Sequence, residues 1–136
     1  MEKRRGIKKE RVVVFGIFDG VHEGHRFLFS QARAFGTDLV AVVGRDDFVR
    51  KFKHKEPRNN EKHRVEMVQK EPLVDKAVLG DEQASSWNIL EQLKPDVICL
   101  GYDQDALEKD LNLWMADHGA SIAVVHALYK NPTDKV

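Results

Sequence analysis

The sequence predicts an α/β fold organised around a parallel sheet of five strands. Three observations point to this class. Short unbroken apolar runs recur along the chain, segments with helical spacing of apolar residues lie between them, and polar turns with glycine follow several runs. Unbroken apolar runs are typical of strands buried on both faces, as in parallel sheets, and the alternation with helices predicts right-handed crossovers.

The first half of the chain contains two predicted strands. The first strand is Arg11 to Phe15, and Glu23 to Phe35 follows as a helix with Gly36 in the position of a C-cap glycine. The second strand is Leu39 to Val43. It leads into Phe48 to Asn60, a polar and basic stretch that we expect to be a long irregular loop; such loops are often functional or mobile.

Three more strands follow in the second half. In chain order we expect a helix at Glu61–Lys70, a strand at Ala77–Leu79, a helix with Ile89, Leu90 and Leu93, a strand at Val97–Leu100, a helix with Leu107, Leu111, Trp114 and Met115, and a strand at Ile122–Val125. Ser85 or Ser86 is expected to cap the middle helix and Pro95 to stop it. The single cysteine, Cys99, lies in an apolar run and is expected in the core, and Trp87 and Trp114 are expected to pack rather than bind bases.

Length and charge limit the possible classes of protein. The 136 residues suit one domain, with residues 1–10 as a flexible basic tail and 11–136 as the folded unit. Because 22 Lys and Arg balance 22 Asp and Glu, a general nucleic-acid binder is not expected. The N-terminus lacks the apolar stretch of a signal peptide and no run is long enough to span a membrane, so we expect a cytoplasmic protein without membrane or nucleic-acid partners.

The segment that holds the predicted site is Gly16 to His25, which follows the first strand. Gly16 and Gly20 bracket a turn, and His22 and His25 open the next helix. Two histidines three positions apart have three possible explanations: a metal site, histidines that pack or cap the helix, and phosphate binding. Glycines that let the backbone approach closely and a helix N-terminus that attracts anions favour phosphate binding, whereas a zinc site lacks matched further ligands.

Gly16-Ile17-Phe18-Asp19-Gly20-Val21-His22-Glu23-Gly24-His25 resembles the G-x-F-D-x-x-H-x-G-H signature of cytidylyltransferase-like nucleotidyltransferases, which ends in the family's HIGH motif. Gly101-Tyr102-Asp103-Gln104 resembles the L-G-Y-D-Q segment of archaeal-type FAD synthases, and Arg64 lies where the family has a helix arginine. The resemblance covers about Val12 to Val125. It implies a Rossmann-like three-layer sandwich of the nucleotidyltransferase, or HUP, type.

The resemblance also implies roles for particular residues. The family transfers a nucleoside monophosphate from a triphosphate to a phosphate-bearing acceptor and releases pyrophosphate, usually with Mg²⁺. The implied catalytic residues are His22 and His25 at the α-phosphate, Lys51 and Lys53 as cations, and Arg64. The implied nucleotide-binding residues are Gly16, Ile17, Phe18, Gly24, Gly101 and Asp103, with Asp19 near the reacting phosphates. No metal ligand is assigned.

The resemblance leaves the substrates open. The Gly101-to-Gln104 segment favours transfer of AMP from ATP to FMN, as in FAD synthases, and the alternative is a CTP-dependent enzyme acting on glycerol 3-phosphate or a similar alcohol. Ile17 replaces the threonine that is common in cytidylyltransferases. The family's last motif, a Ser/Thr-rich segment opening a final helix, would begin near Lys130 and is not found, so we expect a truncated chain or an incomplete triphosphate clamp. A nucleotide-binding domain without turnover is a third possibility, and a homodimer is expected by analogy.

Overall fold

The computed structural model describes residues 10–83 and 85–128. The elements in chain order are β1 (Arg11–Gly16), α1 (Glu23–Arg33), β2 (Asp38–Val43), α2 (Asp46–Lys53), α3 (Glu61–Gln69), β3 (Lys76–Leu79), α4 (Asn88–Leu93), β4 (Val97–Leu100), α5 (Asp105–His118) and β5 (Ala123–His126). All four strand pairings are parallel, in the order β3-β2-β1-β4-β5. The predicted fold class and all five strands are confirmed.

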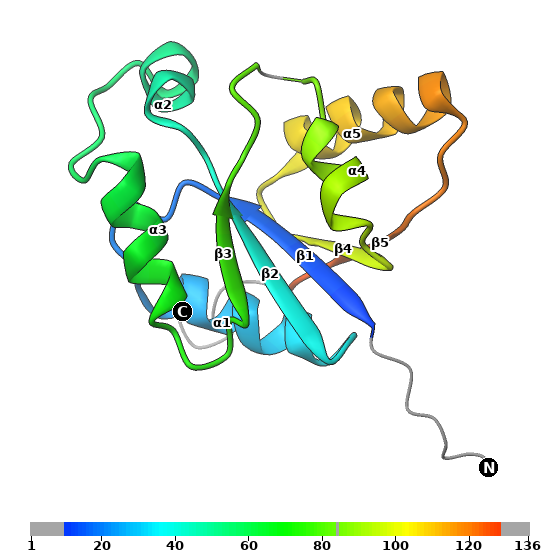
Figure 1. Cartoon of the computed structure of the whole chain (residues 1–136), viewed down its shortest axis with the longest axis horizontal. Coiled ribbons are helices and arrows are strands. Elements are labelled where there is room, and N and C mark those ends of the chain that lie inside the picture. Colours follow the sequence, from blue (N-terminus) through cyan, green and yellow to red (C-terminus); the bar gives the residue numbers. More distant parts are fainter. Residues whose placement is uncertain (1–9, 84, 129–136) are drawn as a thin grey trace.

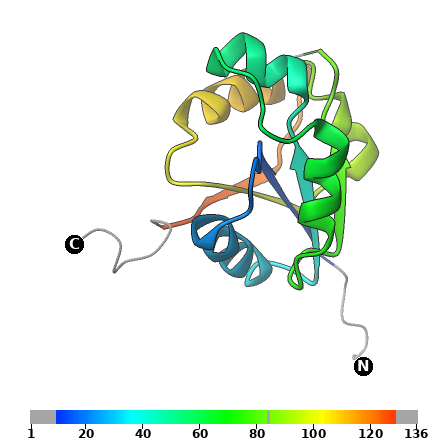
Figure 2. The ribbon, with the colours of Figure 1, turned by 90° about the vertical axis from the view of Figure 1, so that its left-hand side faces the viewer.

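Two helical layers cover the sheet, because alternate side chains of each strand point to opposite faces. Val12 and Val14 of β1 face a cluster that includes Phe29 of α1 and Val68 of α3. Val13 and Phe15 face the other cluster, with the apolar residues of α4 and α5. The helices α1 and α5 therefore lie on opposite faces of the sheet (Figures 1 and 2).

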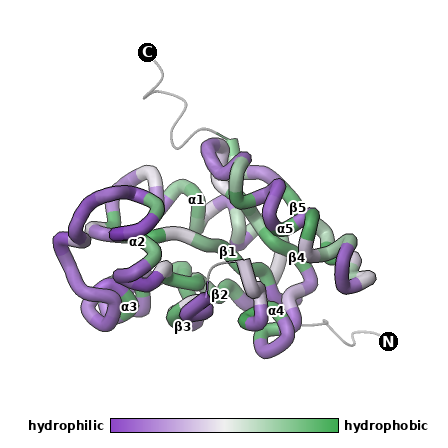
Figure 3. The backbone as a smooth tube through the Cα atoms, turned by 90° about the horizontal axis from the view of Figure 1, so that it is seen from above, coloured by the Kyte–Doolittle hydropathy of each residue, from purple (hydrophilic) through white to green (hydrophobic). Residues whose placement is uncertain are grey.

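The strand order reverses between β1 and β4. Chain connections leave β1 toward β2 on one side and reach β4 on the other, and β1 pairs with β4 at only two positions, Val12 and Val13. Ligands of open α/β sheets bind at such a switch point, beyond the carboxyl ends of the strands. Figure 3 looks onto this edge, with α1, α2 and α5 placed around β1.

The predicted loop at Phe48 to Asn60 is wrong in its first half, which belongs to α2. This helix has Asp46 and Asp47 in its first turn and three basic residues in its last, which suits the helix dipole. One side of it is anchored by Val49, which is fully buried. A single buried residue among charged neighbours gives too weak a periodic signal to identify a helix from sequence.

Two predicted helix ends also differ. Gly36 is not the cap of α1, which ends at Arg33 with Ala34 as its C-cap. A Cβ on Gly36 would instead lie 2.5 Å from the Glu10 carbonyl oxygen. Neither Ser85 nor Ser86 caps α4, because the backbone N–H of Ile89 donates to Asp81 over 3.0 Å. Asp81 is eight residues before Ile89, whereas capping patterns in a sequence concern residues within about one helical turn.

The packing predictions for the rare residues hold. Cys99 is fully buried, and burial raises the pKa of its thiol to about 11. Trp87 is buried against Phe15 in an edge-to-face contact, and its indole N–H donates to Asp110 over 3.0 Å. Trp114 stacks on His118. None of the helices in residues 10–83 and 85–128 has the length and hydrophobicity needed to cross a bilayer.

Candidate active site

The two predicted histidines form a reciprocal cap at the start of α1. The N–H of Gly24 donates to Nδ1 of His22 over 3.0 Å, and the N–H of His22 donates to Nδ1 of His25 over 3.2 Å. The rings are stacked with centroids 3.8 Å apart. A neutral imidazole that accepts at Nδ1 carries its proton on Nε2, so both neutral rings offer an Nε2–H donor.

The capping and phosphate-binding explanations are therefore compatible, because they use different ring nitrogens. Burial, and then the neighbouring His22 ring, lower the pKa of His25 to about 4, against the smaller opposing effect of Asp103. His25 is consequently neutral near pH 7. A neutral donor fixed at a helix N-terminus is suited to an anionic oxygen, to which the helix dipole adds attraction.

The turn between β1 and α1 is tightly packed around Phe18. This residue is 2% exposed, has φ of 56°, and contacts the His25 ring edge-to-face with centroids 5.1 Å apart. A Cβ on Gly16 would lie 2.6 Å from the Phe18 ring, so the ring occupies the space that a side chain would need. The buried Phe18 ring thus packs against His25 and fills the space beside Gly16.

Asp19 holds the end of the α2–α3 loop against this turn. Its carboxylate accepts from the backbone N–H of Arg58 over 2.6 Å and from the backbone and side chain of Asn59 over 3.0 and 2.9 Å. Burial alone would raise the pKa of Asp19, but these hydrogen bonds and the charge of Arg64 together lower it. Asp19 therefore lies at the predicted site, and both of its carboxylate oxygens accept hydrogen bonds from Arg58 and Asn59.

Arg64 lies beneath the site and is fully buried. Its guanidinium donates to the carbonyls of Ile17 (2.9 Å), Gly44 (2.6 Å) and Asn59 (2.9 Å), and it pairs with Asp46 over 2.5 Å. These groups belong to the ends of β1 and β2, the start of α2 and the α2–α3 loop. Since no part of Arg64 reaches solvent, it positions the surrounding backbone and does not contact a substrate in this structure.

The end of β4 is joined to the end of β1 by Gln104. Its side chain accepts from the N–H of Gly101 over 2.7 Å and donates to the carbonyl of Phe15 over 2.9 Å. These bonds bridge the switch point where the two strands separate. Asp103 is exposed and close enough to His25 to influence its pKa, so Gly101 and Asp103 lie on the same side of the sheet edge as the histidines.

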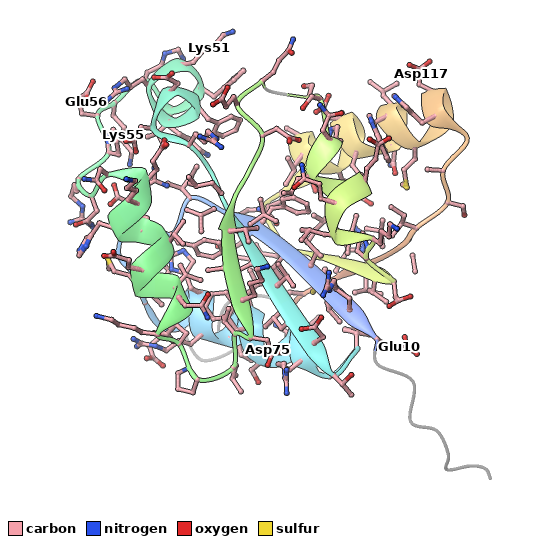
Figure 4. All side chains as sticks on the ribbon, in the orientation of Figure 1. Glu10, Lys51, Lys55, Glu56, Asp75 and Asp117 are labelled. Carbon is pink, nitrogen blue, oxygen red and sulfur yellow. The ribbon has the colours of Figure 1, made fainter. Side chains whose placement is uncertain are left out.

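The structure does not bring the predicted lysines into the hydrogen-bonded site. Lys51 and Lys53 are exposed in the last turn of α2, and Figure 4 shows Lys51 pointing outward from the molecule. Lys51 lies over the ring of Phe52 at 5.5 Å. Their role at the phosphates stays a prediction.

Three residues of the site were missed from sequence: Gln104, Arg58 and Asn59. All three act through backbone groups or through Asp19, and such contacts leave no spacing pattern in the sequence. A clue for Arg58 and Asn59 was their place near Pro57, at the end of the basic stretch.

No zinc-like cluster supports the metal explanation of the histidines. Within residues 10–83 and 85–128, no group of three His, Cys, Asp or Glu side chains could hold a metal ion. A hollow of about 360 Å³ opens instead at the end of β3, lined by polar residues that include Arg45, Gln83 and Asn88. It contains none of the predicted site residues.

Comparison with known proteins identifies the family of this chain. Residues 13–134 match the sequence model of a family described as cytidylyltransferase-like. The chain belongs to the cytidylyltransferase-like family. The prediction of a nucleotidyltransferase of this family is therefore confirmed. The matched residues include the histidine turn, α2, α3 and the end of β4.

Several relatives of this cytidylyltransferase-like chain are archaeal. The FAD synthase of Pyrococcus horikoshii is 35% identical over 128 residues, covering 94% of this chain and 86% of that protein. The FAD synthase of Aciduliprofundum boonei is 41% identical over 115 residues, covering 85% and 76%. Both matches extend over most of both chains.

Solved structures agree with the fold. The lipopolysaccharide core biosynthesis protein of Thermoplasma volcanium superposes with a TM-score of 0.81 at 32% identity, over 90% of this chain and 98% of that one. The pantoate-beta-alanine ligase of Francisella tularensis superposes with a TM-score of 0.63 at 11% identity, over 90% and 60%. The second likeness concerns the fold alone.

Proposed function

We propose that this protein is an adenylyltransferase of the FAD synthase type, which transfers AMP from ATP to FMN. The observation that carries the proposal is the pair of Nε2–H donors presented by His22 and His25 at the N-terminus of α1. The names of the archaeal relatives support the choice of substrates, since several are FAD synthases at 33–42% identity over most of their length.

In the proposed reaction, a phosphate oxygen of FMN attacks the α-phosphorus of ATP. The new P–O bond forms as the bond between the α-phosphorus and the bridging oxygen of the β-phosphate breaks, and pyrophosphate leaves with the bonding electrons. The phosphate nucleophile is already ionised near neutral pH, so no general base is needed. Positioning and charge stabilisation then account for the catalysis, and this chain supplies both.

Different residues are proposed to position the nucleotide and to stabilise phosphate charge. His22 and His25 donate through Nε2 to the α-phosphate oxygens, whose charge is redistributed in the transition state. Because the pKa of His25 is about 4, this donor keeps the same neutral form across the physiological range. The backbone of Gly16 and Ile17 lines the nucleotide side, and Asp103 reaches the ribose or base. Lys51 and Lys53 are proposed to approach the phosphates from α2.

A Mg²⁺ ion is proposed to enter with the triphosphate and would neutralise phosphate charge when bound. Mg²⁺ at such sites needs only one or two protein carboxylates, because phosphates and water supply the other ligands. Asp19 is a poor candidate, since both of its carboxylate oxygens accept hydrogen bonds from Arg58 and Asn59. Asp103 is exposed, and its effect on the pKa of His25 is larger than that of Glu71.

The test is a matrix of two nucleotides, ATP and CTP, and two acceptors, FMN and glycerol 3-phosphate, in which release of pyrophosphate and formation of the nucleotidyl-transfer product are both measured. We expect product only with ATP and FMN. Turnover with CTP and glycerol 3-phosphate instead would replace the proposal with the cytidylyltransferase alternative. Tight nucleotide binding without turnover of any pair would favour a binding domain. A Lys76→Gln variant, changed at an exposed position of β3 at its amino end, is a control that should match the unaltered chain.

A further inference from the structure

The guanidinium of Arg58 lies on the glycine turn that leads into the paired histidines. Its Nη2 donates to the backbone carbonyl of Asp19 over 3.1 Å. A Cβ built on Gly20 would come within 3.2 Å of the same nitrogen, and Gly20 has φ of +96°. The Arg58 guanidinium is thus held beside Gly20, two residues before His22. Gly20 has no side chain that could crowd it.

Arg58 is fixed there by its own backbone. The carboxylate of Asp19 accepts from the Arg58 N–H and from both nitrogens of Asn59. These three bonds dock the end of the α2–α3 loop onto the turn. The side chain therefore starts from an ordered position, which reduces the entropy that binding would otherwise cost.

Arg58 also differs from the other arginines in the part of the chain that the structure describes. Each of the others has an ion pair with a carboxylate: Arg11 with Asp38, Arg26 with Glu71, Arg33 with Asp75, Arg45 with Glu61, Arg50 with Glu56, and Arg64 with Asp46. Arg58 has no such partner among residues 10–83 and 85–128, and it is exposed. Its Nε and Nη1 donate to none of these residues.

We propose that Arg58 is a phosphate-binding residue of this site, with its unused donors directed to a phosphoryl group beside the one that the histidines bind. A guanidinium matches two phosphate oxygens with two parallel N–H groups, which a lysine cannot do. The inference rests on the proposed function for the identity of the ligand. The phosphoryl group belongs either to the pyrophosphate end of the nucleotide or to the acceptor FMN.

Binding of pyrophosphate and of FMN, each measured separately by titration calorimetry, tests this assignment and separates the two sources. We expect Arg58→Gln to weaken binding of one probe by about 10- to 100-fold, as for loss of hydrogen bonds to a charged group. Arg58→Lys should recover part of the affinity, because it restores charge without the two-pronged geometry. Arg50→Gln is the matched control, since Arg50 is also exposed to solvent but is paired with Asp47 and Glu56.

Loss with pyrophosphate assigns Arg58 to the nucleotide, and loss with FMN assigns it to the acceptor. The inference is overturned if Arg58→Gln binds both probes as the unaltered chain does, if Arg50→Gln loses as much, or if the unaltered chain binds neither probe. FAD formation is a separate measurement. If no FAD forms but Arg58→Gln still loses pyrophosphate affinity, the proposed function fails and the phosphate-binding role of Arg58 stands. If Arg58→Gln forms FAD with unchanged KM values for ATP and FMN, the proposed function stands and the phosphate-binding role of Arg58 fails.

Discussion

Replacing Arg64 by methionine should destabilise the fold far more than replacing an exposed arginine. Methionine keeps most of the length of the side chain but removes every donor. The guanidinium makes three hydrogen bonds to backbone carbonyls and one ion pair with Asp46, and it is fully buried. Its loss leaves the Asp46 carboxylate and the three carbonyls unpaired at the junction of β1, β2 and α2.

The size of the effect follows from burial. Removing one partner of a buried ion pair typically costs about 3–5 kcal/mol. The Asp46 side chain is 18% exposed, so water can partly solvate it, and we expect a value near the lower end, about 3 kcal/mol. Arg50→Met is the control: its pairs with Asp47 and Glu56 lie at the surface, where water and salt screen them, so the variant should keep nearly the stability of the unaltered chain.

Urea unfolding followed by fluorescence of the two tryptophans measures both variants. With a slope of roughly 2 kcal/mol per molar urea, the midpoint of Arg64→Met should fall by about 1.5 M while that of Arg50→Met stays within about 0.5 M. A loss below about 1 kcal/mol for Arg64→Met, together with a large fall in turnover, would refute the reasoning. Arg64 would then act on the substrate and not on the backbone.

Three further outcomes are expected. Gly16→Ala should lower the free energy of unfolding by about 1–3 kcal/mol, because its Cβ would meet the buried Phe18 ring at 2.6 Å; a urea midpoint equal to that of the unaltered chain would contradict this. The folded-state pKa of His25 is about 4, below its unfolded value, so stability should fall by on the order of 2 kcal/mol as the pH drops from about 6.5 to 4, and His25→Gln should lose this slope in unfolding curves recorded across that range. Asp81→Ala should cost about 1 kcal/mol at the start of α4, whereas Ser86→Ala, which removes a buried hydroxyl without a partner, should cost almost nothing; equal losses would count against the cap assignment.

The elements that sequence predicted well are those with a strong periodic or compositional signal. Unbroken apolar runs located all five strands within a residue or two, because a strand buried on both faces has no polar position. The spacing of glycines and histidines located the candidate site for a similar reason. The turn before α1 has a distinctive composition that is visible within a short stretch of sequence. The lone buried Val49 of α2 gave no comparable signal.

The rest of the site depends on contacts between distant parts of the chain. Arg64 reads from sequence as a helix arginine, and only the fold brings the carbonyls of Ile17 and Gly44 to its guanidinium. The same holds for Gln104, whose side chain donates to the carbonyl of Phe15, 89 positions earlier in the chain. Local patterns cannot report such pairings.

Some expectations concern features outside these observations. Residues 1–9 of the basic tail predicted at 1–10, and the region near Lys130, where the family's last motif would begin, lie outside the described residues. The homodimer, the cytoplasmic location and the roles of Lys51 and Lys53 stay predictions. Size measurement in solution would test the first of these directly.

The central claim is that AMP transfer to FMN takes place at the Nε2–H donors of His22 and His25. The most direct test is the initial rate of FAD formation by the His22→Ala/His25→Ala double variant, compared with the unaltered chain at saturating ATP and FMN. We predict a fall of at least about 10²–10³, as for loss of an oxyanion donor, with the protein still folded by its tryptophan fluorescence. A double variant that folds and forms FAD at the full rate would contradict the account.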